Sequence, residues 1–517
     1  MNSVLLRLFS ISLAVTLFSC IESNRKEQDD MQPSKPNILI IYLDDLGYGD
    51  VGFNGGTGIK TPNFDRLASQ GLNFTNGYAS SATCTPSRYA LLTGVYPWRN
   101  KNARILPGTA PLLIDTAQMT IPKMLKTQGY HTGIVGKWHL GLGTGYVNWN
   151  ETVSPGPNEV GFDYSYIMAA TQDRVPTVYI ENGDVVGLDP EDPIEISYDK
   201  NFEGEPTGKD NPELLKMKWH HGHNSSIVNG IPRIGFMKGG DAAKWVDEDM
   251  ADHFLAKAQA YVKARKNEPF FLFYPMQQPH VPRTPHPRFV GKTGLGPRGD
   301  VIAEADWMVG ELVKTLEEQG VLDNTLILFS SDNGPVLNDG YYDDSDTKNG
   351  DHTPAGPYRG GKYSLFEAGT HVPFFTYWKG KITSGTSDAL VCQMDFLSSL
   401  ASFVGSDERV ADSQDLMDVF LGKSQQGRDN LVIEATSRTA FRKDNWVMIP
   451  PYKGPAINKQ VNIELANSAE YQLYDLNADI GQQQNLVQSN QEKLKELMAE
   501  YQSIRGVQGE VEQLELK

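Results

Sequence analysis

The stretch Asn37-Ile38-Leu39-Ile40-Ile41-Tyr42-Leu43, which runs directly into Asp44-Asp45, decides the fold of this chain. An apolar run of this length, without alternating polar residues, is typical of a strand buried on both faces in the centre of a parallel sheet. The two carboxylates would then lie at the carboxyl end of that strand, where open α/β sheets bind their ligands.

Other parts of the chain repeat this pattern of an apolar strand that ends in polar residues. Strands are expected at residues 131–136, 270–274 and 325–330, and they lead into Lys137-Trp138-His139, Pro279-His280 and Asp332-Asn333. Helices are expected from Thr61 to about Gly71 and at residues 300–318. Strands that alternate with helices predict the α/β class, with a large, doubly wound and mostly parallel sheet.

The length predicts more than one folding unit. The 517 residues exceed the roughly 250–300 at which a single core stops growing. We expect a catalytic domain at 37–428 and a smaller C-terminal α+β subdomain at 429–517, with short strands followed by a helix at 491–501. Residues 148–238 are rich in Pro, Gly, Asn and His, which predicts a long insertion of loops and short elements that shapes specificity.

The first twenty residues predict an export signal of the lipoprotein type. Arg7 precedes an apolar stretch at 8–18 that is too short for a comfortable membrane span, and Leu17-Phe18-Ser19-Cys20 resembles a bacterial lipobox. Lipidation of Cys20 would anchor the protein to a membrane; plain secretion with a free Cys20 is the alternative. Residues 21–36 would form a polar tether. The expected location is the periplasm or the outer membrane of a bacterium.

Charge and cysteine content narrow the function classes. With 47 basic and 64 acidic residues the net charge is −17, which argues against nucleic acid as a partner, because phosphate binding relies on clustered Lys and Arg. An anionic substrate stays compatible, since a few cations in a pocket outweigh a distant surface field. The three cysteines are Cys20, Cys84 and Cys392. If the first two are modified, no intrachain disulfide can form and Cys392 is a packing residue.

One short motif carries the chemistry. Cys84-Thr85-Pro86-Ser87-Arg88 is followed by Leu91-Leu92-Thr93-Gly94, and alone it is better explained by a small buried thiol beside a helix start. Together with the motifs below it resembles the type I sulfatases of the alkaline-phosphatase-like superfamily. The resemblance implies that a formylglycine-generating or sulfatase-maturing enzyme oxidises Cys84 to formylglycine, the hydrated nucleophile that forms a covalent sulfate intermediate. Arg88 would hold its diol.

Two pairs of oxygen ligands predict a metal site. Asp44-Asp45 and Asp332-Asn333 offer hard oxygen donors, which select calcium or magnesium rather than zinc. Either pair alone could be a solvated turn. With Cys84 they match the sulfatase metal site in residue type and chain order. The resemblance therefore implies one divalent cation, usually calcium, next to residue 84.

Further motifs supply cations and proton carriers. Lys137 and His139 are two residues apart and would share a face of an extended chain. Singly, such pairs are usually surface residues. The resemblance implies that Lys137 and Lys362 bind the sulfate group and that His139 contacts the formylglycine hydroxyl. It places His280 at the bridging oxygen, where a proton must reach the leaving alcohol.

The insertion offers candidate sugar ligands. Gln172, Asp173 and Arg174 combine an amide, an acid and a base that suit sugar hydroxyls, although loop residues of this kind are often only solvated. His220, His221 and His223 look metal-like, but no fourth zinc ligand is evident, and we assign them to the same sugar pocket. This middle region resembles bacterial sulfatases that remove 6-O-sulfate from galactose or N-acetylgalactosamine.

The predicted function is hydrolysis of sulfate esters on a sulfated oligosaccharide. One alternative is a phosphatase or phosphodiesterase of the same superfamily, which would normally present Thr or Ser to two metals. The other is a glycan-binding lipoprotein without catalytic activity.

Overall fold

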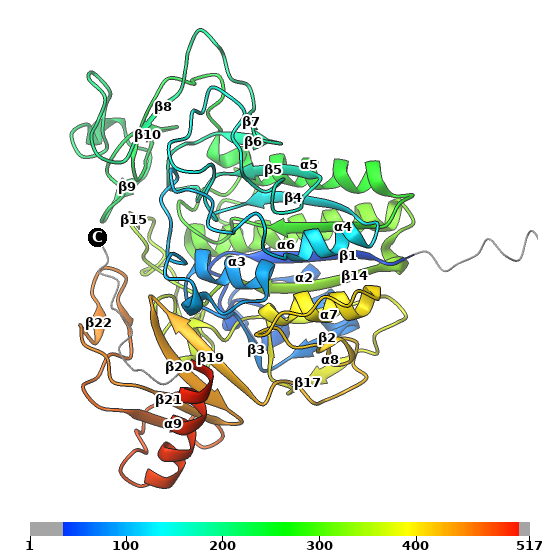
Figure 1. The fold of residues 1–517 in the computed structure, drawn as a ribbon. Coiled ribbons are helices and arrows are strands. Elements are labelled where there is room, and N and C mark those ends of the chain that lie inside the picture. Colours follow the sequence, from blue (N-terminus) through cyan, green and yellow to red (C-terminus); the bar gives the residue numbers. More distant parts are fainter. Residues whose placement is uncertain (1–34, 506–517) are drawn as a thin grey trace, which may run out of the picture. The chain divides into compact units, whose positions relative to one another are not determined.

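The computed structural model describes residues 35–505, of which residues 37–505 belong to one compact unit (Figure 1). The expected signal peptide, Cys20 and nearly all of the tether lie outside the described residues. Within residues 35–505, no helix is long and apolar enough to cross a membrane.

A ten-stranded mixed sheet forms the centre of the unit. Its order is β17 (Gly385–Ser387), β2 (Leu72–Phe74), β16 (Phe375–Tyr377), β14 (Thr325–Ser331), β1 (Asn37–Leu43), β13 (Phe270–Pro275), β4 (His131–Lys137), β5 (Tyr164–Met168), β6 (Tyr179–Glu181) and β7 (Asp184–Val185). The block from β14 to β5 is parallel throughout. The expectation of a mostly parallel α/β sheet is confirmed.

Strand β1 is buried on both faces, as its apolar run predicts. Ile38, Ile40 and Tyr42 belong to the core on one side of the sheet, and the alternate residues Leu39 and Ile41 belong to the core on the other. A central strand needs apolar residues at successive positions because helices cover both of its faces.

The helices divide between these two cores. One core takes its helical residues from α3 (Cys84–Thr93), α4 (Ile121–Thr127), α7 (Phe396–Val404) and α8 (Met417–Phe420). The other takes them from α2 (Pro62–Gln70), α5 (Met250–Arg265) and α6 (Gly296–Glu318). The doubly wound arrangement is therefore present. Helix α2 has the expected bounds, and α6 begins earlier than residue 300, with a proline in its first turn.

The insertion at 148–238 is more regular than expected at its start and irregular afterwards. Strands β5, β6 and β7 extend the central sheet. Short strands follow, namely β8 (Glu195–Ser197), β9 (Lys218–Trp219), β10 (Ile227–Val228), β11 (Ile231–Pro232) and β12 (Phe236–Lys238). Strand β9 pairs with β15 (Tyr341–Tyr342), which comes from the loop after β14.

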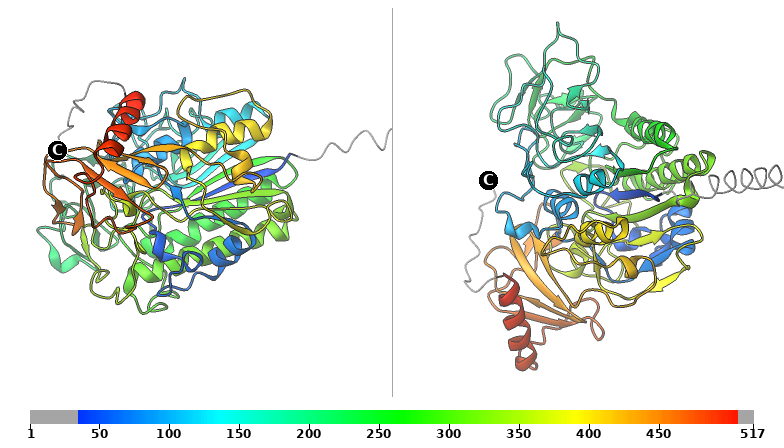
Figure 2. Two further views of the ribbon diagram at one scale, coloured as in Figure 1. Left: turned by 90° about the horizontal axis from the view of Figure 1, so that it is seen from below. Right: turned by 45° about the vertical axis from the view of Figure 1, so that its right-hand side comes forward.

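A four-stranded antiparallel sheet and a helix form the C-terminal α+β subdomain. The strands are β19 (Asn430–Ala435), β20 (Arg438–Lys443), β21 (Trp446–Ile449) and β24 (Gln472–Asp475), and the helix is α9 (Gln491–Arg505). Figure 2 shows α9 against this sheet, where Leu494 and Leu497 join the apolar cluster of Leu431 and Phe441. The boundary at 428/429 stays a prediction, because both parts belong to one compact unit.

Candidate active site

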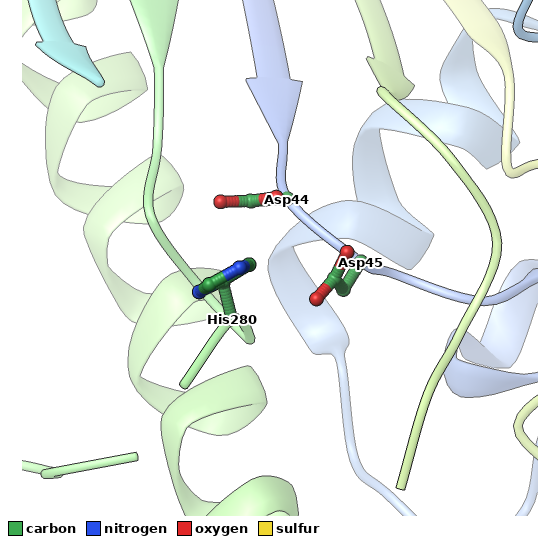
Figure 3. Close-up of side chains that lie close together, drawn as sticks. All are labelled: Asp44, Asp45 and His280. Atoms are coloured by element: carbon green, nitrogen blue, oxygen red, sulfur yellow. The ribbon is translucent and has the colours of Figure 1, made fainter. Parts of the chain in front are cut away.

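Four strands of the central sheet end at one edge, and each leads into a residue of the candidate site. Asp44 follows β1, Asp332 follows β14, Lys137 ends β4, and His280 lies shortly after β13. Figure 3 shows Asp44 and Asp45 at the end of β1, with His280 facing them from the segment after β13. All of these side chains are at most 5% exposed.

The strand register brings the two pairs of oxygen ligands, Asp44-Asp45 and Asp332-Asn333, together. Leu43 of β1 pairs with Ser331 of β14, and the Asp332 amide donates to the Leu43 carbonyl over 3.0 Å. Asp45 has a φ of 64°, a left-handed conformation that costs on the order of 1 kcal/mol in a non-glycine residue. Its amide donates to Asp332 Oδ1 over 3.2 Å, so Asp332 stabilises the conformation of Asp45.

The acidic cluster fits a divalent cation. Ligand atoms of Asp44, Asp45 and His280 lie within 4.8 Å of one another. Asp44 Oδ1 and Asn333 Oδ1 are buried without a hydrogen-bond partner in the part of the chain that the structure describes. Burial, and then the nearby Asp332, raise the pKa of Asp44 well above its usual range. Unpaired, buried oxygens beside mutually repelling carboxylates are a donor set for calcium or magnesium.

Cys84 and Arg88 project from the first turns of α3 into this cluster. The Cys84 side chain is buried, and burial raises the pKa of its thiol. Arg88, one turn later, donates from Nε and Nη2 to Asp332 Oδ2 over 2.9 and 2.6 Å. Thr85 donates to the carbonyl of His139 over 2.9 Å. The start of α3 is thereby tied to the ends of β14 and β4.

Lys137 reaches the cluster from the end of β4, and its ammonium donates to Asp44 Oδ2. The preceding Gly136 has a φ of 134°, and a Cβ there would lie 2.1 Å from the Pro275 carbonyl oxygen. Glycine is therefore required where β4 approaches β13 next to the site.

Lys362 reaches the cluster from a loop. Its Nζ donates to Asp45 Oδ2 over 2.9 Å and to Asp339 Oδ2 over 2.8 Å. Burial alone would lower the pKa of Lys362, but Asp339 and Asp45 outweigh it and raise that pKa well above its usual value. The two carboxylates therefore favour the charged form of this ammonium.

Contacts with backbone carbonyls define the tautomers of the two histidines. His139 Nε2 lies 2.9 Å from the Leu106 carbonyl and must carry the hydrogen, which leaves the buried Nδ1 as an acceptor. His280 Nδ1 lies 2.7 Å from the Val281 carbonyl, so its Nε2 is the free acceptor. Burial, and then neighbouring cations, lower the pKa of both rings well below the usual range, which favours their neutral form.

Comparison with known proteins accounts for this arrangement. The family model described as Sulfatase matches residues 36–406. The chain belongs to the sulfatase family. It is 48% identical over 489 residues to an N-acetylgalactosamine-6-O-sulfatase of Bacteroides thetaiotaomicron, covering 93% of this chain and 96% of the relative. It is 30% identical over 412 residues to the human N-acetylgalactosamine-6-sulfatase, covering 77% and 67%.

A solved structure of a Bacteroides thetaiotaomicron protein, described under the metabolism of multiple glycosaminoglycans, superimposes on this sulfatase with a TM-score of 0.90. The two are 48% identical, and the match covers 91% of this chain and 99% of the other. The protein is thus a sulfuric ester hydrolase. Sulfatases generally use a formylglycine and a divalent cation.

The expected sugar ligands after β5 lie close to this centre. Asp173 is buried between Arg174 Nη1 and His223 Nε2, at 3.0 and 2.7 Å. Burial, then the charge of Lys137 and then that of Arg174 lower the pKa of His139. The Arg174 guanidinium therefore lies near the His139 ring. Gln172 is directed elsewhere, because its amide nitrogen donates to Asp247 over 2.9 Å and is occupied by the protein.

His220 and His221 border the same region. Their Nδ1 atoms are 2.7 Å apart. Burial lowers the pKa of His221, and the charge of Asp339 opposes this shift. In the described part of the chain, the three histidines of this segment form no metal-binding group with each other. Of the six expected sugar ligands, Asp173 thus contacts Arg174 and His223, His220 contacts His221, and Gln172 is bound to Asp247. Their role in sugar binding stays a prediction.

Asp339 is a site residue that the sequence does not predict. It contacts Lys362 and accepts a hydrogen bond from the Tyr363 hydroxyl at 3.2 Å. Its only signal is Asn338-Asp339-Gly340, which reads as an ordinary turn. The sequence also does not predict the contacts of the C-terminal subdomain with the site loops: Glu434 accepts a hydrogen bond from Ser81, and Arg438 donates to the Tyr363 carbonyl over 2.8 Å.

Proposed function

We propose that this sulfatase removes 6-O-sulfate from galactose or N-acetylgalactosamine in sulfated glycans. The observation that carries this proposal is the 48% identity over nearly the whole chain, insertion included, to a protein described as an N-acetylgalactosamine-6-O-sulfatase. Specificity depends on the insertion, so similarity restricted to the catalytic motifs would support only the general reaction.

Cys84 is the proposed site of the formylglycine. Once formed, the hydrated aldehyde would supply one hydroxyl as nucleophile and a second that releases the sulfate. His139 Nδ1 is the free acceptor that could hold such a hydroxyl. The Arg88 guanidinium, which donates two hydrogen bonds to Asp332, lies beside residue 84. A formylglycine-generating or sulfatase-maturing enzyme would therefore be a partner.

The metal would be held by Asp44, Asp45, Asp332 and Asn333 together with residue 84. We propose calcium, since these donors are all hard oxygens. When bound, the ion would polarise the sulfate oxygens.

Lys137 and Lys362 would bind and orient the sulfate group through charge-assisted hydrogen bonds. His280 would hand a proton to the leaving sugar oxygen. Its pKa is depressed by burial and by the lysines. A bound sulfate anion opposes the effect of the lysines, so protonation of His280 and substrate binding favour each other.

We assign the sugar hydroxyls to Asp173, Arg174 and the histidines at 220, 221 and 223, with Gln172 as a more distant member.

The protein would be exported, with residues 1–20 as signal peptide, 21–36 as tether, and Cys20 as the lipid-bearing residue. The catalytic domain would end at 428, with 429–517 as the subdomain that braces it.

Sulfate release from 6-sulfated and 4-sulfated galactose and N-acetylgalactosamine tests the specificity. Preferential release from the 6-sulfated pair is expected. A matched phosphate ester tests the phosphatase alternative, and peptide mass analysis tests conversion at residue 84. Turnover of the phosphate ester alone, or an active protein with an unmodified thiol at residue 84, would contradict the proposal.

A further inference from the structure

The two-stranded ribbon of β9 and β15 lies beyond the sheet edge at which the active-site strands end (Figure 1). Tyr342 of this ribbon is 61% exposed, which is unusual for a large aromatic side chain. Its partner in the antiparallel register is Lys218, also exposed. Directly opposite residues share a face of the ribbon, so an aromatic ring and an ammonium group stand side by side towards solvent.

The ribbon is connected to the sulfate-binding lysine through a short segment. Asp339 contacts Lys362, and Tyr342 follows three residues later. At about 3.4 Å per extended residue, Tyr342 lies at most ~10 Å along the chain from Asp339. That span is comparable to one sugar ring beyond the ring that carries the sulfate.

Neighbouring side chains hold Tyr342 in place. Tyr341 points inward, where its hydroxyl donates to the Pro232 carbonyl over 2.7 Å and its ring centroid lies 4.6 Å from that of His223. Alternation along β15 therefore turns Tyr342 outward. Its ring packs edge-on against His220, with 4.8 Å between centroids. The His220 amide in turn donates to the Gly340 carbonyl over 2.8 Å.

We propose that Tyr342 and Lys218 form a subsite for the sugar adjacent to the sulfated one, and that this neighbour carries a carboxylate, as a hexuronate does. The C–H face of a sugar ring packs on an exposed, immobilised aromatic ring. Lys216 and Lys238 form ion pairs with Glu248 and Glu195, whereas no ion pair of Lys218 is found among the described residues. The Lys218 ammonium is therefore available for an acid on the ligand. This inference rests on the proposed glycan sulfatase function.

The test compares kcat/KM for three substrates: the 6-sulfated monosaccharide, the same sugar joined to a hexuronate, and the same sugar joined to a neutral hexose. The wild type should prefer the hexuronate disaccharide. Tyr342→Ala should lower kcat/KM about tenfold for both disaccharides and leave the monosaccharide unchanged. Lys218→Ala should cost about threefold for the hexuronate disaccharide only, and this loss should disappear at high salt.

Tyr146→Ala and Lys209→Ala are the matched controls, since Tyr146 is 93% exposed and Lys209 is an exposed lysine of the same insertion. Both should leave all three rates unchanged. Monosaccharide turnover with no disaccharide preference, or equal losses on all three substrates in Tyr342→Ala, would overturn the subsite alone. Absence of sulfate release by the wild type from every substrate would overturn the proposed function and the subsite with it.

Discussion

Lys362 and Asp339 form a buried ion pair, with 2.8 Å between Nζ and Oδ2. The same ammonium donates to Asp45 over 2.9 Å. A lysine has three N–H donors. Two of them are thus directed at fixed carboxylates, which leaves one for a substrate oxygen.

This pairing predicts the effect of Asp339→Asn. The amide keeps an acceptor but loses the charge, and hydrogen bonds to charged groups contribute about 1.5–3 kcal/mol. We expect kcat/KM to fall by roughly tenfold or more, mainly through KM, because the lysine is held less firmly for sulfate. Asp346→Asn, an exposed acid of the same loop, is the control. Equal kinetics in both variants would show that Asp339 does not position Lys362.

The position of Cys84 predicts that replacing Cys84 and replacing Cys392 by serine have very different effects on activity. Cys84 and Cys392 are both free and buried, but only Cys84 lies in the acidic cluster. Cys84→Ser should abolish turnover, because a serine that accepts the sulfuryl group has no second hydroxyl to release it. Cys392→Ser should retain activity and lose about 1–3 kcal/mol of stability, because it buries a hydroxyl. Steady sulfate release by Cys84→Ser, with the residue verified by mass, would refute this.

The Arg88–Asp332 fork predicts a large stability loss in Arg88→Met. Both side chains are at most 1% exposed. Removing one partner of a buried ion pair costs about 3–5 kcal/mol, since the other charge stays buried. The loss in denaturant unfolding should be greatest after chelation, when no metal compensates Asp332. Lys495→Met, in an exposed helical pair with Glu492, should cost about 0.5 kcal/mol or less. Similar losses in both variants would argue against the buried pair.

The raised pKa of the buried Glu304 predicts that the stability of the protein depends on pH. Glu304 accepts from the His286 amide over 2.9 Å, and burial raises its pKa to about 7 from an ordinary value of 4.5. Between these values the folded state holds a proton that unfolding releases. The free energy of unfolding should therefore decrease as the pH rises through this window, by up to about 3 kcal/mol.

Glu304→Gln should flatten this slope, and Glu318→Gln, which changes an exposed acid of the same helix, should not. Urea denaturation at a series of pH values measures both. A slope in Glu304→Gln as steep as in the wild type would rule out Glu304 as its source.

The contact of Arg438 with the Lys362 loop predicts that the C-terminal subdomain affects catalysis. Arg438 donates to the carbonyls of Tyr363 and Leu465, each over 2.8 Å. Arg438→Ala should reduce kcat/KM about tenfold while the catalytic side chains stay intact. Lys443→Ala, a change in the same strand at a surface pair with Glu500, should have no such effect. Unchanged kinetics in Arg438→Ala would limit the subdomain to a role in stability.

The strands of the parallel block could be predicted because each is an apolar run with a polar end. Residues 37–43 and 325–330 correspond to β1 and β14 with nearly the expected bounds. Strands β6 and β7 were not predicted, since strands of two or three residues carry no periodic signal. Asp339 was missed for a related reason: a loop residue acquires its role from what folds against it.

The sequence by itself determined the fold class, the pairs of oxygen ligands at the strand ends and the cysteine motif. All three depend only on the local hydrophobic pattern and on residue type. Only the tertiary structure decided which carboxylate contacts which lysine, where the segment proposed to bind the sugar lies, and that the C-terminal subdomain contacts the loops around Cys84 and Lys362. These contacts join residues up to hundreds of positions apart, and their partners are selected by strand register and by the burial of charge, which no local pattern encodes.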